Sequence, residues 1–398
     1  MDALQTIKTS VMKIVITIND MTHLSFKTIS IFAPLLLVIT LVSCSPKDEE
    51  KSNIDYASID EIDLEVELRI TESENFIASN LNGFYAAKDG DLLITERSGT
   101  GIHQFNSHGE YVKRIARDGR GSGELSPWFH SHFNGNTLIA TNNPGYISTI
   151  FQPDEEGIFQ YKRTINQRYP GSFKGFRTEE NLISFYTSEN KAMQSLQVPA
   201  EFTSSNIHII DLKNDTIAVT DSINSLQVHS DLIEEFNGGG IRITTLPYRY
   251  SDTFQPLPTR RFLIARPDKQ TITIYNSELN IEHELKLSVS ERLVSSEDLE
   301  YHLSDHDASA QQKMRELIRD VKPAFMDVKM DDSNRFWLWT DETEKGLEYV
   351  ILSYEGQPIG KVYLSTGEKI EMISENRLYV IREPDDDIPS AIVYSVDI

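Results

Sequence analysis

Short apolar runs recur along the chain, and most follow a turn rich in Asp, Asn, Gly or Ser. A continuous apolar run of three to five residues is typical of a strand covered on both faces. The turns, such as KDGD at 88–91 and SENR at 374–377, favour β-hairpins. The six runs lie at 92–94, 138–140, 182–185, 262–265, 336–339 and 378–381.

The spacing of these runs predicts a repeated four-stranded unit. Three intervals between run starts, 92 to 138, 138 to 182 and 336 to 378, are 46, 44 and 42 residues long. This is the period of a β-propeller blade. The two longer intervals contain segments without strand alternation, at 188–205, 224–240 and 288–322, which we interpret as insertions. The pattern predicts an all-β, six-bladed β-propeller, with seven blades as the alternative count.

The insertion between blades four and five has a helical pattern. Apolar residues recur at helical spacing from Met314 to Val321, and Pro323 ends the run. Ser295 and Asp298 have the spacing of an N-terminal cap. We therefore expect a helical insertion here.

The last blade lacks one strand at the C-terminus. The segment Ile62–Ile70 (IDLEVELRI) is a strand without a blade of its own. A ring of blades must close to hide its strand edges. We therefore expect Ile62–Ile70 to be the outer strand of the last blade.

The N-terminal region carries a secretory signal. Residues 29–42 form an uncharged apolar run that, at 1.5 Å per residue, is too short for a hydrocarbon core of about 30 Å. The run ends in Leu41-Val42-Ser43-Cys44, which resembles the lipobox of bacterial lipoproteins. This resemblance implies cleavage before Cys44, lipidation of its thiol and membrane attachment through that lipid. Met21 would give a signal of ordinary length, so the upstream residues are interpreted as an over-extended start.

Three regions follow from this: a signal region at 1–44, a flexible acidic tether at 45–61 and a single propeller at 62–398. The tether begins Ser-Pro-Lys-Asp-Glu-Glu, which has no Asp directly after Cys44. It also resembles a short export signal of surface lipoproteins, although a solvated polar linker has the same composition. The expected location is the outer membrane, on its periplasmic side or at the cell surface.

A Gly-rich loop follows the first predicted blade. Residues 117–125 read RDGRGSGEL, which resembles the inter-blade loop G-x-G-x-G-E-F of TolB-like and NHL-type six-bladed propeller lipoproteins, with Leu125 in place of Phe. Residues 323–338 are similar to that family's next recurrent element. No Lys and no helix follow the loop, so it matches neither a P-loop nor a dinucleotide-binding loop. The resemblance implies the fold and assigns no activity.

The composition of the chain excludes several classes of function. The chain of 398 residues has 38 Lys and Arg against 61 Asp and Glu, a net charge of −23, which argues against nucleic acid as a partner. Its single Cys excludes a disulfide framework and, once lipidated, leaves no thiol nucleophile. We expect a lipid-anchored binding or scaffolding module with a protein or glycan partner and no cofactor.

The alternative is a metal-dependent propeller enzyme of the lactonase or lyase kind. His130 and His132 would lie on the same side of one strand and could supply two ligands to a divalent metal. No third ligand is evident at matching positions. Residues 331–334 lack the Gly and distal Glu of a calcium loop, and 385–387 would need ligands from elsewhere. Both read as loop residues.

Three second strands end in arginine, which suggests an anion site. Arg97, Arg266 and Arg382 are expected around one mouth of the central channel, on the face that carries the insertions. The same face would hold the following residues of the inter-blade loop: Arg117, Arg120 and Trp128. Guanidinium groups bind carboxylate or phosphate in bidentate fashion. The alternative is that the three strand-end arginines pair with Glu96, Asp268 and Glu383.

Overall fold

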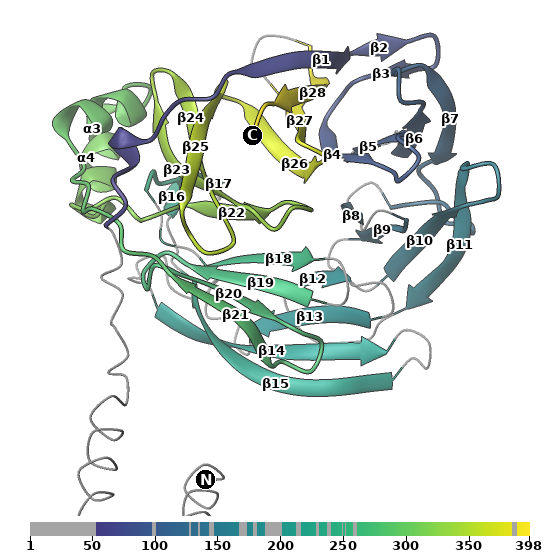
Figure 1. Cartoon of the computed structure of the whole chain (residues 1–398), viewed down its shortest axis with the longest axis horizontal. Coiled ribbons are helices and arrows are strands. Elements are labelled where there is room, and N and C mark those ends of the chain that lie inside the picture. The colour runs from purple at the N-terminus through teal and green to yellow at the C-terminus, as the bar shows by residue number, and fades with distance from the viewer. Residues whose placement is uncertain are drawn as a thin grey trace, which may run out of the picture. The chain divides into compact units, whose positions relative to one another are not determined.

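Each of the six apolar runs forms the second strand of a four-stranded antiparallel sheet, and the sheets surround a common centre as an all-β propeller (Figure 1). The computed structural model describes residues 53–398 except for gaps at 98–100, 127–128, 134–135, 143–146, 167–172, 178–180, 188–200, 212–215, 228–230, 237–239, 249, 251, 258–260 and 384–387. Between 166 and 245 it describes only the backbone. None of the helices in these described ranges is long and apolar enough to cross a membrane.

Five of the sheets have described side chains. They consist of β4 (Leu81–Ala86), β5 (Leu92–Glu96), β6 (Gly101–Phe105) and β7 (Tyr111–Ala116); β8 (Phe129–Phe133), β9 (Leu138–Asn142), β10 (Ile147–Pro153) and β11 (Phe159–Asn166); β18 (Thr253–Leu257), β19 (Arg261–Arg266), β20 (Thr271–Tyr275) and β21 (Ile281–Lys286); β22 (Asp327–Met330), β23 (Phe336–Thr343), β24 (Gly346–Leu352) and β25 (Pro358–Leu364); and β26 (Glu368–Ser374), β27 (Arg377–Arg382), β28 (Ser390–Val396) and β1 (Leu64–Ile70).

One further four-stranded sheet is described by its backbone pairing alone. It contains β12 (Phe173–Arg177), β13 (Asn181–Thr187), β14 (Glu201–Asp211) and β15 (Thr216–Gln227). Side-chain packing therefore documents five blades, and the expected count of six depends on this sheet. Two short hairpins accompany the sheets: β2 (Glu72–Ser73) with β3 (Phe76–Ile77), and β16 (Asp231–Phe236) with β17 (Gly240–Thr245).

The ring closes as the sequence predicts. Strand β1 pairs antiparallel with β28, with Leu64 opposite Val396 and Ile70 opposite Ala391. The first strand of the described chain thus completes the sheet formed by the last three. This pairing satisfies backbone groups of β28 that would otherwise form an open edge.

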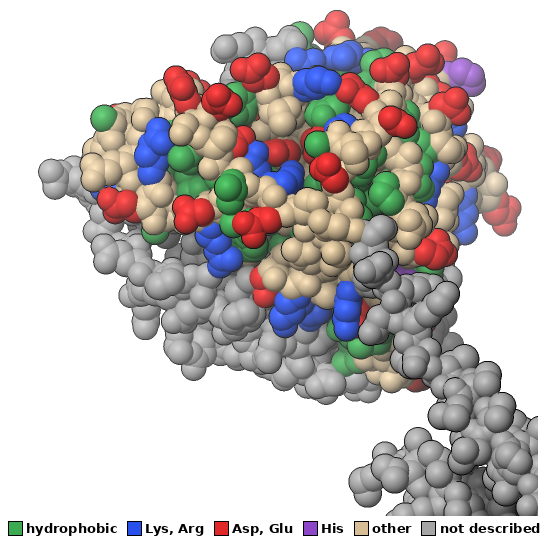
Figure 2. Space-filling view, turned by 60° about the vertical axis from the view of Figure 1, so that its left-hand side comes forward, with side chains coloured by type: hydrophobic (Ala, Val, Ile, Leu, Met, Phe, Trp, Pro, Cys, Tyr) green, Lys and Arg blue, Asp and Glu red, His purple; other side chains and the backbone are tan. Residues whose placement is uncertain are grey.

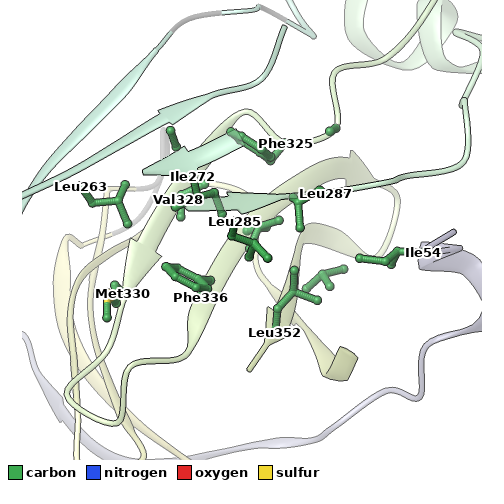
Figure 3. Close-up of a cluster of buried hydrophobic side chains, with 14 of the residues drawn as sticks. Ile54, Leu263, Ile272, Leu285, Leu287, Phe325, Val328, Met330, Phe336 and Leu352 are labelled. Atoms are coloured by element: carbon green, nitrogen blue, oxygen red, sulfur yellow. The ribbon is translucent and has the colours of Figure 1, made fainter. Parts of the chain in front are cut away.

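Hydrophobic clusters fill the spaces between neighbouring sheets. One cluster joins β18–β21 to β22–β25 and includes Leu263, Ile272, Phe325 and Phe336, each completely buried (Figure 3). Ile54 lies at the edge of this cluster. The runs that read as covered strands are covered because a neighbouring sheet packs on each side.

The prediction that residues 45–61 form a flexible tether is wrong for residues 53–61, which lie against the sheets. The backbone N–H of Ile54 donates to Ser288 at 2.7 Å, and that of Ile62 donates to Lys361 at 2.8 Å. Tyr56, at the start of η1 (Tyr56–Ser58), is 2% exposed. Apolar side chains in an otherwise acidic segment hold it against the sheets, so we call residues 53–62 the strap. Residues 1–52 lie outside the described part.

The helical insertion is present, in two pieces. Helix α3 (Ser296–Leu303) begins with the predicted capping box, in which Ser295 and Asp298 exchange side-chain and backbone hydrogen bonds. Helix α4 (Ala308–Leu317) ends six residues before Pro323, because Ile318 already has extended backbone angles. The helices bury Leu303, Ala310 and Met314 against Leu246.

The segments 188–205 and 224–240 are predicted to lack strands, but the structure has strands at their margins. Strand β14 begins at Glu201, β15 continues to Gln227, and β16 and β17 form a separate hairpin. The parts of β14 and β15 that fall within these segments, 201–205 (EFTSS) and 224–227 (NSLQ), are mostly polar, so they lack the apolar alternation by which sequence patterns identify a strand.

Candidate functional site

The arginine-bearing strand ends share one face of the propeller. In the fourth sheet, Arg266 pairs with Thr271 and Thr271 pairs with Lys286, so the second and fourth strands end at the same edge. Arg97 directly follows β5 and Arg382 ends β27, which are the equivalent second strands. Because the sheets repeat the same strand order around the ring, these ends lie on one face. We call it the decorated face, since helices α3 and α4 follow β21 there.

Arg97 is held at this face by a bulge in the neighbouring strand. The pairing of β4 with β5 shifts between Leu81 and Gly83, and Asn82 lies at the shift. The Nε of Arg97 donates to Oδ1 of Asn82 at 3.2 Å, while Nδ2 of Asn82 donates to the carbonyl of Phe129 at 2.7 Å. Bulges redirect side chains in this way. Arg97 is exposed, and within the described part of the chain its two Nη groups have no hydrogen-bond partner.

Two more basic side chains lie near Arg97. His130 follows Phe129 on β8, and Lys369 lies on β26 with its side chain 61% exposed. Partial burial of His130, together with the positive charges of Arg97 and Lys369, lowers its pKa. The three groups come from three different sheets and lie close enough for the charges of Arg97 and Lys369 to act on His130. The ammonium group of Lys369 forms an ion pair with Glu371, two residues further along the same strand, at 2.5 Å.

The other two predicted arginines are less available. The Arg266 side chain is 11% exposed, and its Nε lies 3.7 Å from Oδ2 of Asp252. The Nε of Arg382 is buried, and its residue stands opposite Glu368 in the sheet. Among the three, Arg97 presents its guanidinium most openly.

The alternative that the arginines pair with neighbouring acids in the sequence is wrong for Arg97 and Arg266. The carboxylate of Glu96 is 1% exposed, lies 3.3 Å from His103 Nε2 and accepts the backbone N–H of Ser79 at 3.0 Å. It is therefore directed away from Arg97. For Arg266, the partner is Asp252 instead of Asp268. In both cases the contact crosses the sheet instead of linking sequence neighbours.

The Gly-rich loop is organised by its own glutamate. Glu124 accepts the backbone N–H of Gly121 at 2.7 Å and Nε of Arg117 at 3.0 Å, and these bonds lower its pKa. A Cβ at Gly119 would lie 2.0 Å from the Glu124 carboxylate, so a side chain at this position would displace Glu124 from its hydrogen bonds in the loop. This supports its interpretation as a structural turn. Arg120 is exposed, whereas Trp128 lies outside the described residues.

The metal candidates receive little support. His130 and His132 occupy β8 as expected, but the described residues contain no group of three or more His, Cys, Asp or Glu placed to hold a metal ion. Asp331 accepts Nε of Arg335 at 2.7 Å and Nε1 of Trp337 at 2.9 Å, as a hairpin turn residue would. Cys44 and residues 385–387 lie outside the described part.

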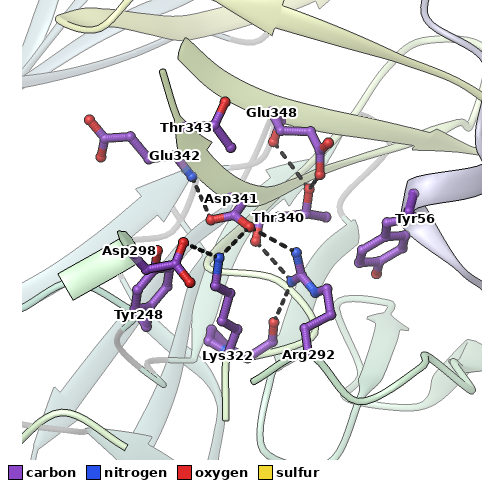
Figure 4. Close-up of polar contacts among 12 residues, drawn as sticks. Tyr56, Tyr248, Arg292, Asp298, Lys322, Thr340, Asp341, Glu342, Thr343 and Glu348 are labelled. Atoms are coloured by element: carbon purple, nitrogen blue, oxygen red, sulfur yellow. Dashed lines mark hydrogen bonds and ion pairs between the residues drawn. The ribbon is translucent and has the colours of Figure 1, made fainter. Parts of the chain in front are cut away.

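The decorated face holds a second polar cluster that the sequence pattern does not indicate (Figure 4). The ammonium group of Lys322 lies 2.7 Å from Asp298 on α3 and 2.8 Å from Asp341 on β23. Arg292 also contacts Asp341, at 3.3 Å, and donates to the carbonyl of Thr340 at 2.9 Å. These contacts fix the insertion to the fifth sheet.

The same cluster continues to the strap. Thr340 lies at a bulge in β23 and donates to Glu348 at 2.6 Å. Glu348 lies 3.6 Å from Lys361, and Lys361 donates to the carbonyl of Tyr56 at 3.1 Å. Strap, fifth sheet and insertion thus form one polar unit. No local sequence motif joins the residues of this cluster. The only signal in the sequence is the pair of acids, Asp341 and Glu342, that directly follows the apolar run WLWT.

Comparison with known proteins gives fold-level likeness only. No protein family model matches the chain, and no curated protein does. Among solved structures, a candidate exported protein of Bacteroides fragilis is similar at a TM-score of 0.49 and 13% identity, covering 84% of this chain and 96% of that one. A member of the DUF4221 family from Bacteroides vulgatus has a TM-score of 0.48 and 12% identity, with 85% and 98% covered. A virginiamycin B lyase from Staphylococcus aureus has a TM-score of 0.41 and 9% identity, with 84% and 100% covered. At these values none of the three supports an argument about activity.

Proposed function

We propose that this chain is a lipid-anchored six-bladed β-propeller of the bacterial outer membrane that binds an anionic group on its decorated face. The lipobox-like sequence ending in Cys44 supports the anchor, and the Gly-rich loop supports the relationship to TolB-like and NHL-type lipoproteins. The six blades are the five with described side chains and the sheet β12–β15. The ligand is a carboxylate or phosphate carried by a glycan or a protein partner.

The exposed guanidinium of Arg97 is the observation that carries the proposal. Asn82 orients it through Nε, which leaves both Nη groups for a ligand. Two parallel N–H donors match the two oxygens of a carboxylate or phosphate. His130 adds a positive charge beside it only when protonated, and Lys369, although paired with Glu371, keeps its side chain 61% exposed there. The net charge of the chain is −23. Arg266 and Arg382 act as supporting charges set deeper in the sheets.

Binding of defined anions tests this proposal. The probes are an oligogalacturonate, a poly-glutamate peptide and inorganic phosphate, each measured by calorimetry at low and high salt. We expect at least one to bind the parent in a salt-sensitive way and Arg97→Gln to abolish that binding. Arg377→Gln is the matched control, because the Arg377 side chain is 42% exposed at the opposite end of a second strand and pairs with Glu67 at 2.6 Å.

Two outcomes would overturn the anion site: no probe binds the parent, or Arg97→Gln binds as the parent does. The metal-dependent enzyme stays as the alternative function because His130 and His132 lie on one strand. A divalent ion there would be repelled by Arg97 and Lys369, which disfavours it. One tightly held divalent ion per purified chain would support the enzyme instead.

A further inference from the structure

The strap leaves the propeller at a defined point. Nδ2 of Asn53 donates to Oγ of Ser290 at 2.9 Å. Ile54 exchanges backbone hydrogen bonds with Ser288 at 2.7 Å and with Ser290 at 3.0 Å. The segment that leads to Cys44 must therefore begin beside Ser290.

This exit point is on the decorated face. Leu287 donates its backbone N–H to the carbonyl of Gln270 at 2.8 Å, and Val289 donates to the Gln270 side chain at 3.3 Å. Gln270 belongs to the turn between Arg266, which ends β19, and Thr271, which begins β20. The strap thus attaches at the same edge of the fourth sheet as Arg266.

Two large apolar side chains are exposed near the exit point. Leu293 is 65% exposed and Leu317, at the end of α4, is 54% exposed. Leu293 is three residues from Ser290, so the two Cα atoms are at most about 11 Å apart. Leu293 bridges Val321, four residues after Leu317, which brings both leucines to one edge of the insertion. In Figure 2, which brings this side forward, isolated hydrophobic side chains lie among acidic and basic ones.

We propose that the decorated face is turned toward the membrane and that Leu293 and Leu317 contact the lipid surface. This inference rests on the proposed lipidation of Cys44. Only eight residues, 45–52, separate Cys44 from the strap, so the exit point stays within roughly 30 Å of the lipid anchor. Apolar side chains that enter the headgroup region gain burial without a protein partner.

The chemistry of the patch favours lipid over a second copy of the chain. The surface of two leucine side chains is far smaller than the roughly 800 Å² per partner that a stable interface buries. Arg315 lies in the last turn of α4 and Arg319 stacks over the ring of Tyr250 at 4.2 Å, while the exposed Glu291, Glu316 and Asp320 offset their charge. The contact is therefore mainly apolar, and zwitterionic phosphatidylcholine vesicles are the proper probe.

A site-specific fluorescent label tests the orientation on the full lipidated chain. Acylation of Cys44 leaves an introduced cysteine as the only thiol, so Leu317→Cys and Glu278→Cys can each be labelled and reconstituted. Glu278 is the control because it is exposed in the turn before β21, at the opposite edge of the same sheet. We expect nitroxide-headgroup lipid to quench the label at 317 several-fold more than the label at 278.

Equal quenching at both positions, stronger quenching at 278, or none at 317 would overturn the orientation. Vesicle flotation and incorporation of a fatty-acid label, measured on the same preparations, report the anchor separately. Floating, lipid-labelled protein with the wrong quenching pattern refutes the orientation alone. Protein that carries no lipid refutes the anchor and this inference with it, while anion binding by the soluble propeller would be unaffected.

Discussion

The ammonium group of Lys322 donates to the carboxylate of Asp341 at 2.8 Å, and this contact joins the helical insertion to strand β23. The Lys322 side chain is 8% exposed and that of Asp341 11%. Asp298 on α3 and Arg292 on the preceding segment meet the same pair. The insertion on the decorated face is therefore held by buried charge as well as by the Leu303 and Met314 packing.

Replacing Lys322 should destabilise the protein strongly. Lys322→Met removes the cation between Asp298 and Asp341 and leaves two largely buried carboxylates, of which Asp341 keeps its contact with Arg292. Removal of one partner from a buried ion pair costs roughly 3 kcal/mol. Urea denaturation followed by circular dichroism measures the loss directly.

The control for this prediction is Lys345→Met. Lys345 contacts Glu61 at 2.7 Å, but the two side chains are 62% and 45% exposed. Exposed pairs contribute about 0 to 1 kcal/mol, so this substitution should change stability little. Similar losses in the two variants would show that the Lys322 cluster is no stronger than a surface pair.

His302 should make stability depend on pH. Its Nε2 lies 3.1 Å from the Tyr248 hydroxyl, and burial, assisted by the charge of Lys322 and opposed by Asp341 and Asp298, lowers its pKa. The unfolded chain, with a histidine pKa of about 6.5, binds a proton before the folded chain does. The free energy of unfolding should therefore fall as pH drops below about 6.5, until the folded state also takes up the proton.

His302→Gln tests this pH dependence, because glutamine can bond Tyr248 without titrating. Denaturation of parent and variant from pH 8 to pH 5 should show the parent losing stability relative to the variant on acidification. A constant difference across this range would mean that His302 contributes nothing to the pH profile.

Local patterns predicted the sheets because each blade is a local unit. The run at Phe262 and the run at Phe336 are apolar on both faces, and their hairpin partners are within a few residues. The closing strand could be predicted because an unpaired edge is costly, and its pairing with β28 confirms this. The ends of β14 and β15 at 201–205 and 224–227 are mostly polar and lacked the apolar signal.

The site was less predictable because its key contacts depend on β-bulges. Asn82, Thr340 and Glu371 each lie where the strand pairing shifts by one residue. A shift of this kind turns a side chain away from the regular alternation. Asn82 could not be recognised as the partner of Arg97 without the register, and neither could Thr340 as the partner of Glu348.

Two glycines should differ in their tolerance of alanine. Gly346 and Gly90 both have positive φ, +119° and +90°, which already costs alanine about 1 kcal/mol. At Gly346, a Cβ would also lie 2.0 Å from the backbone carbonyl oxygen of Leu364, whereas at Gly90 the nearest atom is 3.4 Å away. Gly346→Ala should therefore lower the melting temperature clearly more than Gly90→Ala, and equal shifts would contradict the close approach.

Loss of the closing strand should cause aggregation. Deletion of residues 52–70 removes the strap and β1, which exposes the edge of β28 and the Ile54 side of the hydrophobic cluster. Deletion of residues 45–51 spares both. In chains without the signal region, light scattering and thermal melting should separate the two deletions, and equal melting temperatures would refute closure by β1.

Anion binding at Arg97 should strengthen as the solution becomes more acidic. Partial burial, together with the charges of Arg97 and Lys369 beside it, lowers the pKa of His130, so the imidazole stays neutral at pH 8. Below about pH 6.5 a bound anion favours its protonation, and by linkage protonation favours the anion. Calorimetry with the anion that binds the parent should show rising affinity from pH 8 to pH 5.5.

In His130→Gln the part of this rise that comes from the imidazole should disappear while binding at pH 8 persists. His108→Gln, in the exposed turn at the far end of the first sheet, is the matched control and should keep the full pH dependence. An unchanged profile in His130→Gln would place the anion away from His130.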